Sequence, residues 1–366
     1  MSEVDSIKQT LKTRKTKMEE VLGADNFLST GSTLLNMALS GNPKGGFCKG
    51  KYFFLVGDSS SGKTFLSLTC LMEASLNPAF DNYRFIFDDV EGGALMDIAK
   101  FFGPQVVERM EPPAKDKQGP IYSATIEEFY FHLDDALQHK KPCIYILDSM
   151  DSLSSDYEEK KFLEKKKAHR KGTQAKGDYG DGKAKMNSSM LRPRIADIKD
   201  TGSILIIINQ TRDNINAGMF EAKKTRSGGH ALTFYATAEI WSSMGAKIVK
   251  NVLGKKRQVG VISNIRVQKN RISGRNRRVE VPIYYSIGID DIGGCINYLL
   301  EEGCWKRKGS KIQMTGLGPE LVATETKLIQ HIEEHGLEED LQQLVATTWN
   351  DIEKRCAVKR KMRYER

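Results

Sequence analysis

Gly57-Asp58-Ser59-Ser60-Ser61-Gly62-Lys63-Thr64 is the stretch that decides the fold of this chain. It matches the phosphate-binding loop pattern G-x-x-x-x-G-K-[ST] at every fixed position. An apolar, strand-like run precedes it at 51–56, and an apolar run that predicts a buried helix follows it at 65–74. Because this motif requires a strand, a glycine-rich turn and the start of a helix, a chance Gly/Ser turn is the weaker interpretation.

The residue types of the loop suit a nucleoside triphosphate. Glycines let the backbone curl so that successive N–H groups point at one anion, and the N-terminus of the next helix adds its positive end. Lys63 can reach the β and γ phosphates, and the Thr64 hydroxyl can hold Mg²⁺. Residues 57–64 are therefore the candidate nucleotide site, although the loop does not name the reaction.

The composition sets broad limits. The 366 residues are enough for one large core and a small satellite domain, and no run is apolar enough to span a membrane. The polar start, 1–17, lacks a signal-peptide core, and the six cysteines have no C-x-x-C spacing, so we expect reduced thiols in a cytoplasmic protein. The net charge of +9 is compatible with a polyanionic partner, but charge alone does not identify one.

Four short apolar runs alternate with helical patterns and predict an α/β fold with a mostly parallel central sheet. They are 51–56, 84–88, 143–148 and 203–208. Carboxylates at the ends of such strands lie on the ligand-binding edge of the sheet. Glu91 is a candidate to orient or deprotonate an attacking water, with a solvated loop acid as the alternative, and Asp148 is a candidate to hold Mg²⁺ directly or through water.

Other segments are less specific. Residues 5–22 predict an amphipathic helix that packs on its own core or on a neighbouring subunit. Residues 33–39 predict a helix capped by Ser32 or a neighbour. The basic run 158–171 is either a functional loop or a lysine-rich helix exposed to solvent, and glycines follow it. Edge strands are expected at 260–269 and 279–284.

From Ile208 onward the sequence resembles the RecA recombinase family. The runs in this part are Ile208-Asn209-Gln210-Thr211-Arg212, Gly218-Met219-Phe220 and Gly228-Gly229-His230-Ala231-Leu232-Thr233-Phe234-Tyr235-Ala236. Other runs match in the expected order: Ser29-Thr30-Gly31-Ser32, Asp89-Val90-Glu91, Gln268-Lys269-Asn270-Arg271-Ile272 and Gly303-Cys304-Trp305-Lys306-Arg307-Lys308-Gly309-Ser310-Lys311-Ile312. The resemblance covers roughly 27–312, and the combination is more specific than any single motif.

The resemblance implies ATP and Mg²⁺ as cofactors and gives roles to particular residues. Glu91 would be the base for water, and Gln210 would sense the γ-phosphate and couple it to DNA. Lys269 and Arg271 would reach the ATP of an adjacent subunit, as an arginine finger does. The implied nucleotide and Mg²⁺ residues are Gly57, Asp58, Ser59, Ser60, Ser61, Gly62, Lys63, Thr64 and Asp148, with Thr64 and Asp148 at the metal.

Two DNA-binding loops are also implied, at about 155–192 and 211–229. In the first loop, the family's DNA-contacting positions fall on Lys185, Ser188 and Arg192. In the second, the positions that meet the phosphate backbone are Arg212, Gly228 and Gly229, and Ile215 would be an apolar wedge between base steps.

Four features depart from the bacterial pattern. They are a basic insertion at 157–176, an extra glycine at Gly92-Gly93, a second loop one residue longer, and a basic tail where bacterial proteins have an acidic one. They indicate a divergent member, with phage origin as one interpretation. We expect three parts: an N-terminal helix for oligomerisation (1–28), an ATPase core (29–290) and a small α-rich C-terminal domain with a basic tail (291–366).

The leading hypothesis is an ATP-dependent recombinase that forms helical filaments on single-stranded DNA and pairs it with duplex DNA. Single-strand-binding or mediator proteins are further candidate partners, and a membrane is not expected. It would work at the nucleoid or in the cytoplasm of a phage host. The alternatives are a ring-forming helicase or motor, which normally carries an extra N-terminal domain, and an accessory paralogue that binds ATP but hydrolyses little.

Overall fold

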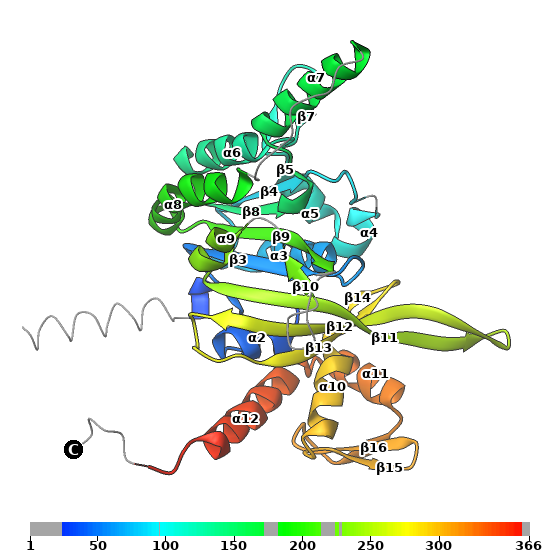
Figure 1. Ribbon diagram of the computed structural model, residues 1–366. Helices are drawn as coiled ribbons and strands as arrows, with labels where there is room; N and C mark the ends of the chain where they lie inside the picture. Colours follow the sequence, from blue (N-terminus) through cyan, green and yellow to red (C-terminus); the bar gives the residue numbers. More distant parts are fainter. Residues whose placement is uncertain (1–23, 95, 172–181, 214–223, 227–228, 361–366) are drawn as a thin grey trace, which may run out of the picture.

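A computed structural model describes residues 24–94, 96–171, 182–213, 224–226 and 229–360 of the chain. The predicted N-terminal helix at 5–22 lies outside this part. A large twisted sheet runs through the centre of the molecule, and helices cover both of its faces (Figure 1). Within the described residues its strands follow the order β14-β13-β12-β11-β3-β9-β8-β4-β5, and β10 pairs with β9.

One half of the sheet is parallel, and the central residues of its main strands are buried. Its main strands are β3 (Lys51–Gly57), β9 (Ile204–Asp213), β8 (Cys143–Asp148) and β4 (Arg84–Asp89). All four predicted core strands are confirmed, and β9 runs on to Asp213. Successive side chains point to opposite faces, so Phe53 packs in one apolar cluster and Phe54 in the other.

Each face of the parallel half has its own helices. On one face lie α3 (Lys63–Leu76) and α2 (Thr33–Ser40), the latter capped by the Ser32 hydroxyl as predicted. On the other lie α6 (Ile126–Gln138), α8 (Lys183–Thr201) and α9 (His230–Tyr235). The sheet is therefore the middle layer of three, and its carboxyl edge is free for the loops that could form a site.

The other half of the sheet is antiparallel and was only partly predicted. It contains β11 (Ala238–Val252), β12 (Lys255–Asn270), β13 (Arg278–Tyr284) and β14 (Gly288–Ile289). The expectation that 260–269 is an edge strand is wrong, because β12 lies between β11 and β13. Alternating apolar residues predict a strand but do not say on how many sides it is paired.

The C-terminal region contains helices, as expected. It also contains a small sheet that the sequence did not predict. The helices are α10 (Asp291–Glu301), α11 (Glu325–His335) and α12 (Glu338–Cys356), and the strands are β15 (Lys306–Lys308), β16 (Lys311–Met314) and β17 (Leu321–Ala323). Strands this short show too little alternation to be recognised. Buried residues of this region belong to the same apolar cluster as α2 and α3.

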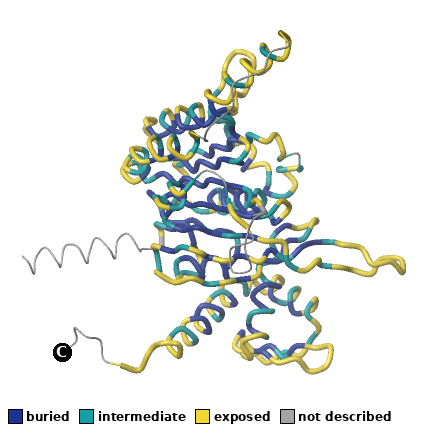
Figure 2. Tube along the Cα trace, viewed as in Figure 1, coloured by how far each residue is buried: buried dark blue, intermediate teal, exposed yellow. Residues whose placement is uncertain are grey.

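Two segments project from the body and are largely exposed (Figure 2). The helix α7 (Asp156–Arg170) has no buried residue, so the lysine-rich run 158–171 is a solvent-exposed helix rather than a loop. The second is the outer part of the β11–β12 hairpin. No helix in the described part could cross a membrane, and all six cysteines are free.

The remaining elements are short. They are η1 (Ala24–Asn26), β1 (Phe27–Leu28), β2 (Phe47–Cys48), η2 (Pro78–Phe80), α4 (Ile98–Phe102), α5 (Pro104–Arg109), β5 (Met110–Glu111), β6 (Ala114–Lys115), β7 (Pro120–Ile121), η3 (Met150–Ser152) and β10 (Lys224–Arg226).

Candidate functional site

The phosphate loop joins β3 to α3 at the carboxyl edge of the sheet. Gly62, at the N-cap of α3, has φ +88°, a conformation in which glycine carries no steric penalty. The Ser61 hydroxyl donates to the Asp58 carbonyl (2.8 Å) and lies 2.8 Å from the Ser242 hydroxyl of β11. Ser263 of β12 donates to the Ser61 carbonyl at 2.8 Å. The loop is therefore held by neighbouring strands as well as by its own backbone.

Lys63 is buried at the base of this loop. Its ammonium group donates to the carbonyl oxygens of Gly57 (3.0 Å) and Asp58 (2.6 Å). Burial lowers the pKa of Lys63, while the carboxylates of Asp148 and Asp58 act in the opposite direction. A buried cation inside a ring of backbone groups is suited to bind phosphate oxygens.

Thr64 and Asp148 meet directly beside the loop. The Thr64 hydroxyl donates to Asp148 Oδ2 at 2.5 Å, which joins the first turn of α3 to the end of β8. Burial raises the pKa of Asp148 to about 6, against the lowering effect of the Thr64 hydrogen bond. A hydroxyl and a carboxylate are hard oxygen ligands, so this pair fits a Mg²⁺ site.

Glu91 follows β4 and is held by three donors. Its Oε1 accepts from the hydroxyls of Ser149 (2.6 Å) and Ser152 (2.8 Å) and from Gln210 Nε2 (3.0 Å). Burial alone would raise the pKa of Glu91, but these hydrogen bonds lower it overall. Glu91 thus stays ionised and oriented, as a base for water requires. The sequence reasoning missed both serines, although their place just after the Asp148 strand was a usable signal.

The end of β9 contacts three acids in succession. Gln210 donates to Glu91, the Thr211 hydroxyl to Asp58 Oδ1, and Arg212 to Asp151 Oδ1 (3.0 Å). Strand alternation places Gln210 and Arg212 on one side and Thr211 on the other. A shift of this strand end would therefore change hydrogen bonds at three points of the candidate site.

Asp58 links the phosphate loop to the β9–β10 hairpin. Besides Thr211, it forms an ion pair with Lys224 of β10. Burial acts to raise the pKa of Asp58, but the bonds from Lys224 and Thr211 lower it overall. The loop pattern leaves this position unspecified, so the motif assigns Asp58 no role beyond the loop.

Lys269 and Arg271 lie far from the phosphate loop of their own chain. Lys269 pairs with Glu239, which aligns with Phe54 in the middle of β3, whereas the loop follows the carboxyl end of that strand. The Arg271 N–H donates to the Thr237 carbonyl, and the Thr237 N–H donates to the Tyr52 carbonyl near the start of β3. Burial, together with the neighbouring Arg271, lowers the pKa of Lys269 to about 8. In this structure the Lys269 ammonium group donates to the carbonyls of Thr233 and Phe234, and Arg271 lies over the Phe234 ring. The role of both residues across an interface stays a prediction.

The predicted DNA-contacting residues fall on two adjacent helices and a strand end. Lys185, Ser188 and Arg192 are exposed on α8 at a spacing that puts them on one face. Gly229, at the N-cap of α9, has φ +76°, and a side chain there would approach Ala184 of α8 to 2.6 Å. The two predicted loop regions therefore meet at Gly229 and α8. Ile215 and Gly228 lie outside the described residues.

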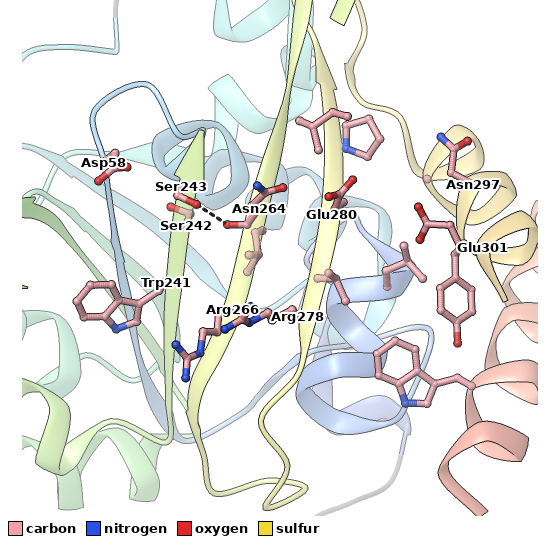
Figure 3. Close-up of a pocket in the computed structure, with 18 of the residues that line it drawn as sticks. Asp58, Trp241, Ser242, Ser243, Asn264, Arg266, Arg278, Glu280, Asn297 and Glu301 are labelled. Atoms are coloured by element: carbon pink, nitrogen blue, oxygen red, sulfur yellow. Dashed lines mark hydrogen bonds between the residues drawn. The ribbon is translucent and has the colours of Figure 1, made fainter. Parts of the chain in front are cut away.

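A groove of about 610 Å³ lies beside the phosphate loop. Figure 3 shows Asp58 at one side and, across the antiparallel strands, side chains of β11, β12 and β13. The labelled residues on these strands are Trp241, Ser242, Ser243, Asn264, Arg266, Arg278 and Glu280. The groove extends from Asp58 of the phosphate loop across these strands to Asn297 and Glu301 of α10.

The fold and this site define the class of the protein: an α/β protein with a P-loop NTPase core. Comparisons with known proteins show which P-loop proteins this chain resembles. The model of the RecA N-terminal domain matches residues 166–290. Protein RecA of Lactococcus lactis subsp. cremoris (strain MG1363) is 26% identical over 288 residues, which are 77% of this chain and 66% of that protein.

Protein RecA of Bacteroides thetaiotaomicron is 28% identical over 293 residues, 77% of this chain and 76% of that protein. The crystal structure of the RadB recombinase is 15% identical, with a TM-score of 0.47, over 72% of this chain and 99% of that chain. The chain is thus similar to bacterial RecA proteins over about three quarters of its length, and residues 166–290 match the RecA N-terminal domain.

Proposed function

We propose that this protein is an ATP-dependent DNA recombinase that forms filaments on single-stranded DNA and promotes homologous pairing and strand exchange. The observation that carries the proposal is the end of β9. There Gln210 contacts the candidate base Glu91, and Thr211 contacts Asp58 of the phosphate loop. The same strand leads directly into the predicted second DNA loop, which begins at residue 211, so nucleotide state and DNA contact would act on one short segment.

In this proposal each residue at the nucleotide site has a separate role. Lys63 and the loop N–H groups bind the β and γ phosphates, and Glu91 orients and deprotonates the attacking water. Mg²⁺, held by Thr64 and Asp148, would neutralise developing phosphate charge. Gln210 would respond to the γ-phosphate through its hydrogen bond to Glu91.

In the proposed mechanism, ATP would bind between adjacent subunits. Lys269 and Arg271 form a pair of neighbouring cations away from their own phosphate loop, and they would stabilise transition-state charge at the ATP of the next subunit. A head-to-tail contact of this kind generates a filament when its rotation does not close. Residues 29–290 would be the ATPase core, 291–366 a smaller C-terminal domain, and 1–28 an oligomerisation segment.

Single-stranded DNA would run along α8 and the β9–β10 hairpin. Lys185, Ser188, Arg192, Arg212 and Gly229 supply charge, hydroxyl and close backbone approach to phosphates without reading bases. Ile215 and Gly228 would complete the second loop. A recombinase must accept any sequence, and this set of residue types meets that requirement.

ATP hydrolysis measured with and without single-stranded DNA, across protein concentrations, tests the proposal. We expect strong stimulation by DNA that rises cooperatively with protein concentration, because the active site is completed between subunits. A rate that responds to neither DNA nor concentration would contradict the proposal, since it would show a site complete within one subunit.

A further inference from the structure

The helix α7 (Asp156–Arg170) projects from the body of the protein, where a second molecule can reach it (Figures 1 and 2). None of its residues is buried, and two apolar side chains near its middle, Phe162 and Leu163, are 64% and 52% exposed. Single exposed apolar side chains are common on protein surfaces. The pattern of residues around Leu163 is therefore needed to show whether a partner covers this helix.

One stripe along α7 carries charges of opposite sign at its two ends. Its members recur every three or four residues, and at about 100° per residue they fall within about 80° of the helix circumference. They are Asp156, Glu159, Leu163, Lys166 and Arg170, and all five are exposed. The less exposed residues of the helix, Lys161 and Ala168, lie on the opposite side. The stripe is therefore on the side of α7 that is most open to the solvent.

The stripe is complementary to itself in an antiparallel arrangement. Leu163 is the midpoint of the helix, and the stripe has two acids before it and two bases after it. If a second α7 lies antiparallel with the two Leu163 side chains in contact, Asp156 faces Arg170 of the other copy. Glu159 then faces Lys166 of the other copy, and two-fold symmetry makes each ion pair occur twice. A parallel arrangement would instead place like charges opposite each other.

The helix macrodipole also favours this order of charges, but it explains only part of the pattern. Acids near the N-terminus and bases near the C-terminus of a helix are stabilised by the macrodipole within the first and last turns. This effect does not depend on which side of the helix carries the charge, and Lys166 lies before the last turn. It also gives no reason for an exposed leucine at the midpoint. An antiparallel second copy accounts for both features.

We propose that α7 binds α7 of a second copy of this chain through the stripe, as an antiparallel pair with Leu163 at its centre. The contact is isologous and closes at two copies, unlike the head-to-tail contact of the proposed filament. Exposed ion pairs contribute little individually, so one pair of helices binds weakly. Many copies of α7 along a filament would act together and would join two filaments side by side. The inference does not rest on the proposed function, because the contact needs neither ATP nor DNA.

Sedimentation velocity of the full-length protein, over a wide range of concentrations and without nucleotide or DNA, measures the self-association. Asp156→Lys/Glu159→Lys makes the stripe wholly basic, and Lys166→Glu/Arg170→Glu makes it wholly acidic. Either variant alone should self-associate about tenfold more weakly than the parent, because every ion pair becomes a like-charge contact. An equal mixture of the two should regain at least the parental association, because a basic stripe then faces an acidic one.

Two lysines beside the stripe provide a control in which the expected effect has the opposite sign. Lys160 and Lys167 lie on the same flank, so Lys160 of one copy would approach Lys167 of the other in the antiparallel pair. Lys160→Ala/Lys167→Ala removes this repulsion and keeps a high helix propensity, so self-association should strengthen by about threefold. Leu163→Ala also keeps the helix and should weaken self-association by a similar factor, because the central apolar contact is lost.

Parental self-association in either charge-reversed variant would overturn the proposal, as would an equal mixture that fails to associate. Weaker association of Lys160→Ala/Lys167→Ala would also overturn it, because it would show that α7 acts through its total positive charge. Association that appears only after DNA is added would overturn it in favour of a DNA contact by α7. A parent protein that hydrolyses no ATP would contradict the proposed function, but the measurements without nucleotide would still decide the role of α7.

Discussion

Glu91 shows how local hydrogen bonds can prepare a single residue for catalysis. A carboxylate after a strand is ordinarily a solvated acid, and burial would raise its pKa. Ser149, Ser152 and Gln210 reverse that effect by donating to one oxygen of Glu91. The second oxygen is left for another donor, and a water beside the γ-phosphate is the donor that the proposed reaction supplies.

At this scale we predict that Glu91→Gln separates binding from hydrolysis. The amide keeps the size of the side chain but cannot take a proton, so ATP turnover should fall by about 10²–10⁴-fold. ATP affinity should change by less than about threefold, because Lys63 and the loop N–H groups remain. Steady-state ATPase assays and nucleotide titrations measure the two effects.

The control is Glu108→Gln, an exposed acid on α5 that should have no effect on turnover. Turnover at the parental rate in Glu91→Gln would exclude Glu91 as the base. Loss of both ATP affinity and turnover would instead show that Glu91 maintains the structure of the nucleotide site.

The residues that could be predicted from the sequence are those fixed by a motif. The spacing of the loop identifies Lys63 and Thr64, and a strand that ends in an acid identifies Asp148. The contacts of Asp58, Ser149 and Ser152 could not be predicted, because they join segments that are distant in sequence. The bond between Thr211 and Asp58 spans 153 positions of the chain, which no local pattern reports.

At the scale of elements, the β9–β10 hairpin is tied to the phosphate loop through Asp58 and Lys224. The carboxylate of Asp58 lies in the loop, where it would repel a bound triphosphate if its charge were not compensated. Lys224 supplies that compensation from β10, so the hairpin adjusts the electrostatics of the nucleotide site.

We therefore predict that Lys224→Ala weakens ATP binding in the absence of DNA by about threefold, the size expected of a half-exposed ion pair. In an Asp58→Asn background the same change should have less than about a 1.5-fold effect, since no unpaired carboxylate remains. Fluorescent nucleotide titrations of the four proteins form the double-mutant cycle. Additive effects would show that the ion pair does not act on the nucleotide.

Another element contact joins α10 to the start of α2. Asp291 accepts from the backbone N–H and the hydroxyl of Thr33, both at 2.7 Å. Burial raises the pKa of Asp291 from 3.8 to about 6, although the bonds from Thr33 act to lower it. The folded protein thus binds this proton more tightly than the unfolded chain, and the contribution of Asp291 to the unfolding free energy falls as pH rises from about 4 to about 6.

Asp291→Asn removes this titration. Relative to the parent, the variant should gain about 1–3 kcal/mol of unfolding free energy between pH 4 and pH 7, because one pKa unit corresponds to about 1.4 kcal/mol. Urea unfolding at the two pH values measures the difference. Asp340→Asn, an exposed acid on α12, is the control, and an equal difference between Asp291→Asn and the parent at both pH values would refute the prediction.

Element prediction worked where strands are buried on both faces and failed where they are exposed. The apolar run 203–208 locates β9, but the strand continues to Asp213 through polar residues that pair with β3 and β10. The outer part of the β11–β12 hairpin was missed because its strands lack a buried face and therefore lack alternation. The lysine-rich α7 remained ambiguous because a helix that is polar all round has no apolar stripe to identify it.

At the scale of the whole molecule, the sheet separates two halves of one proposed active site. The phosphate loop, Thr64 and Asp148 lie at the carboxyl edge, whereas Lys269 and Arg271 lie toward the other end of the neighbouring strands. The order of motifs in the chain predicts the parallel fold but cannot show this separation, which depends on the antiparallel pairing of β11 with β12. In a head-to-tail assembly the two edges of adjacent subunits would face each other.

This geometry predicts that two inactive variants restore each other. Glu91→Gln should lack the base at its own ATP, and Arg271→Ala should fail to complete the ATP site of its neighbour. In mixed filaments a site is complete where an Arg271→Ala subunit supplies Glu91 and an adjacent Glu91→Gln subunit supplies Arg271. An equal mixture should therefore recover up to about a quarter of parental ATPase activity on single-stranded DNA.

The control is a mixture of Glu91→Gln with Glu91→Gln/Arg271→Ala, in which no complete site can form and activity should stay at the level of the single variants. Recovery only in the first mixture would require that the active site is shared between subunits. Activity in Arg271→Ala alone that matches the parent would remove Arg271 from the reaction. Failure of the first mixture, despite filaments that contain both variants, would place Glu91 and Arg271 in separate roles, and the interface between subunits would then serve assembly rather than hydrolysis.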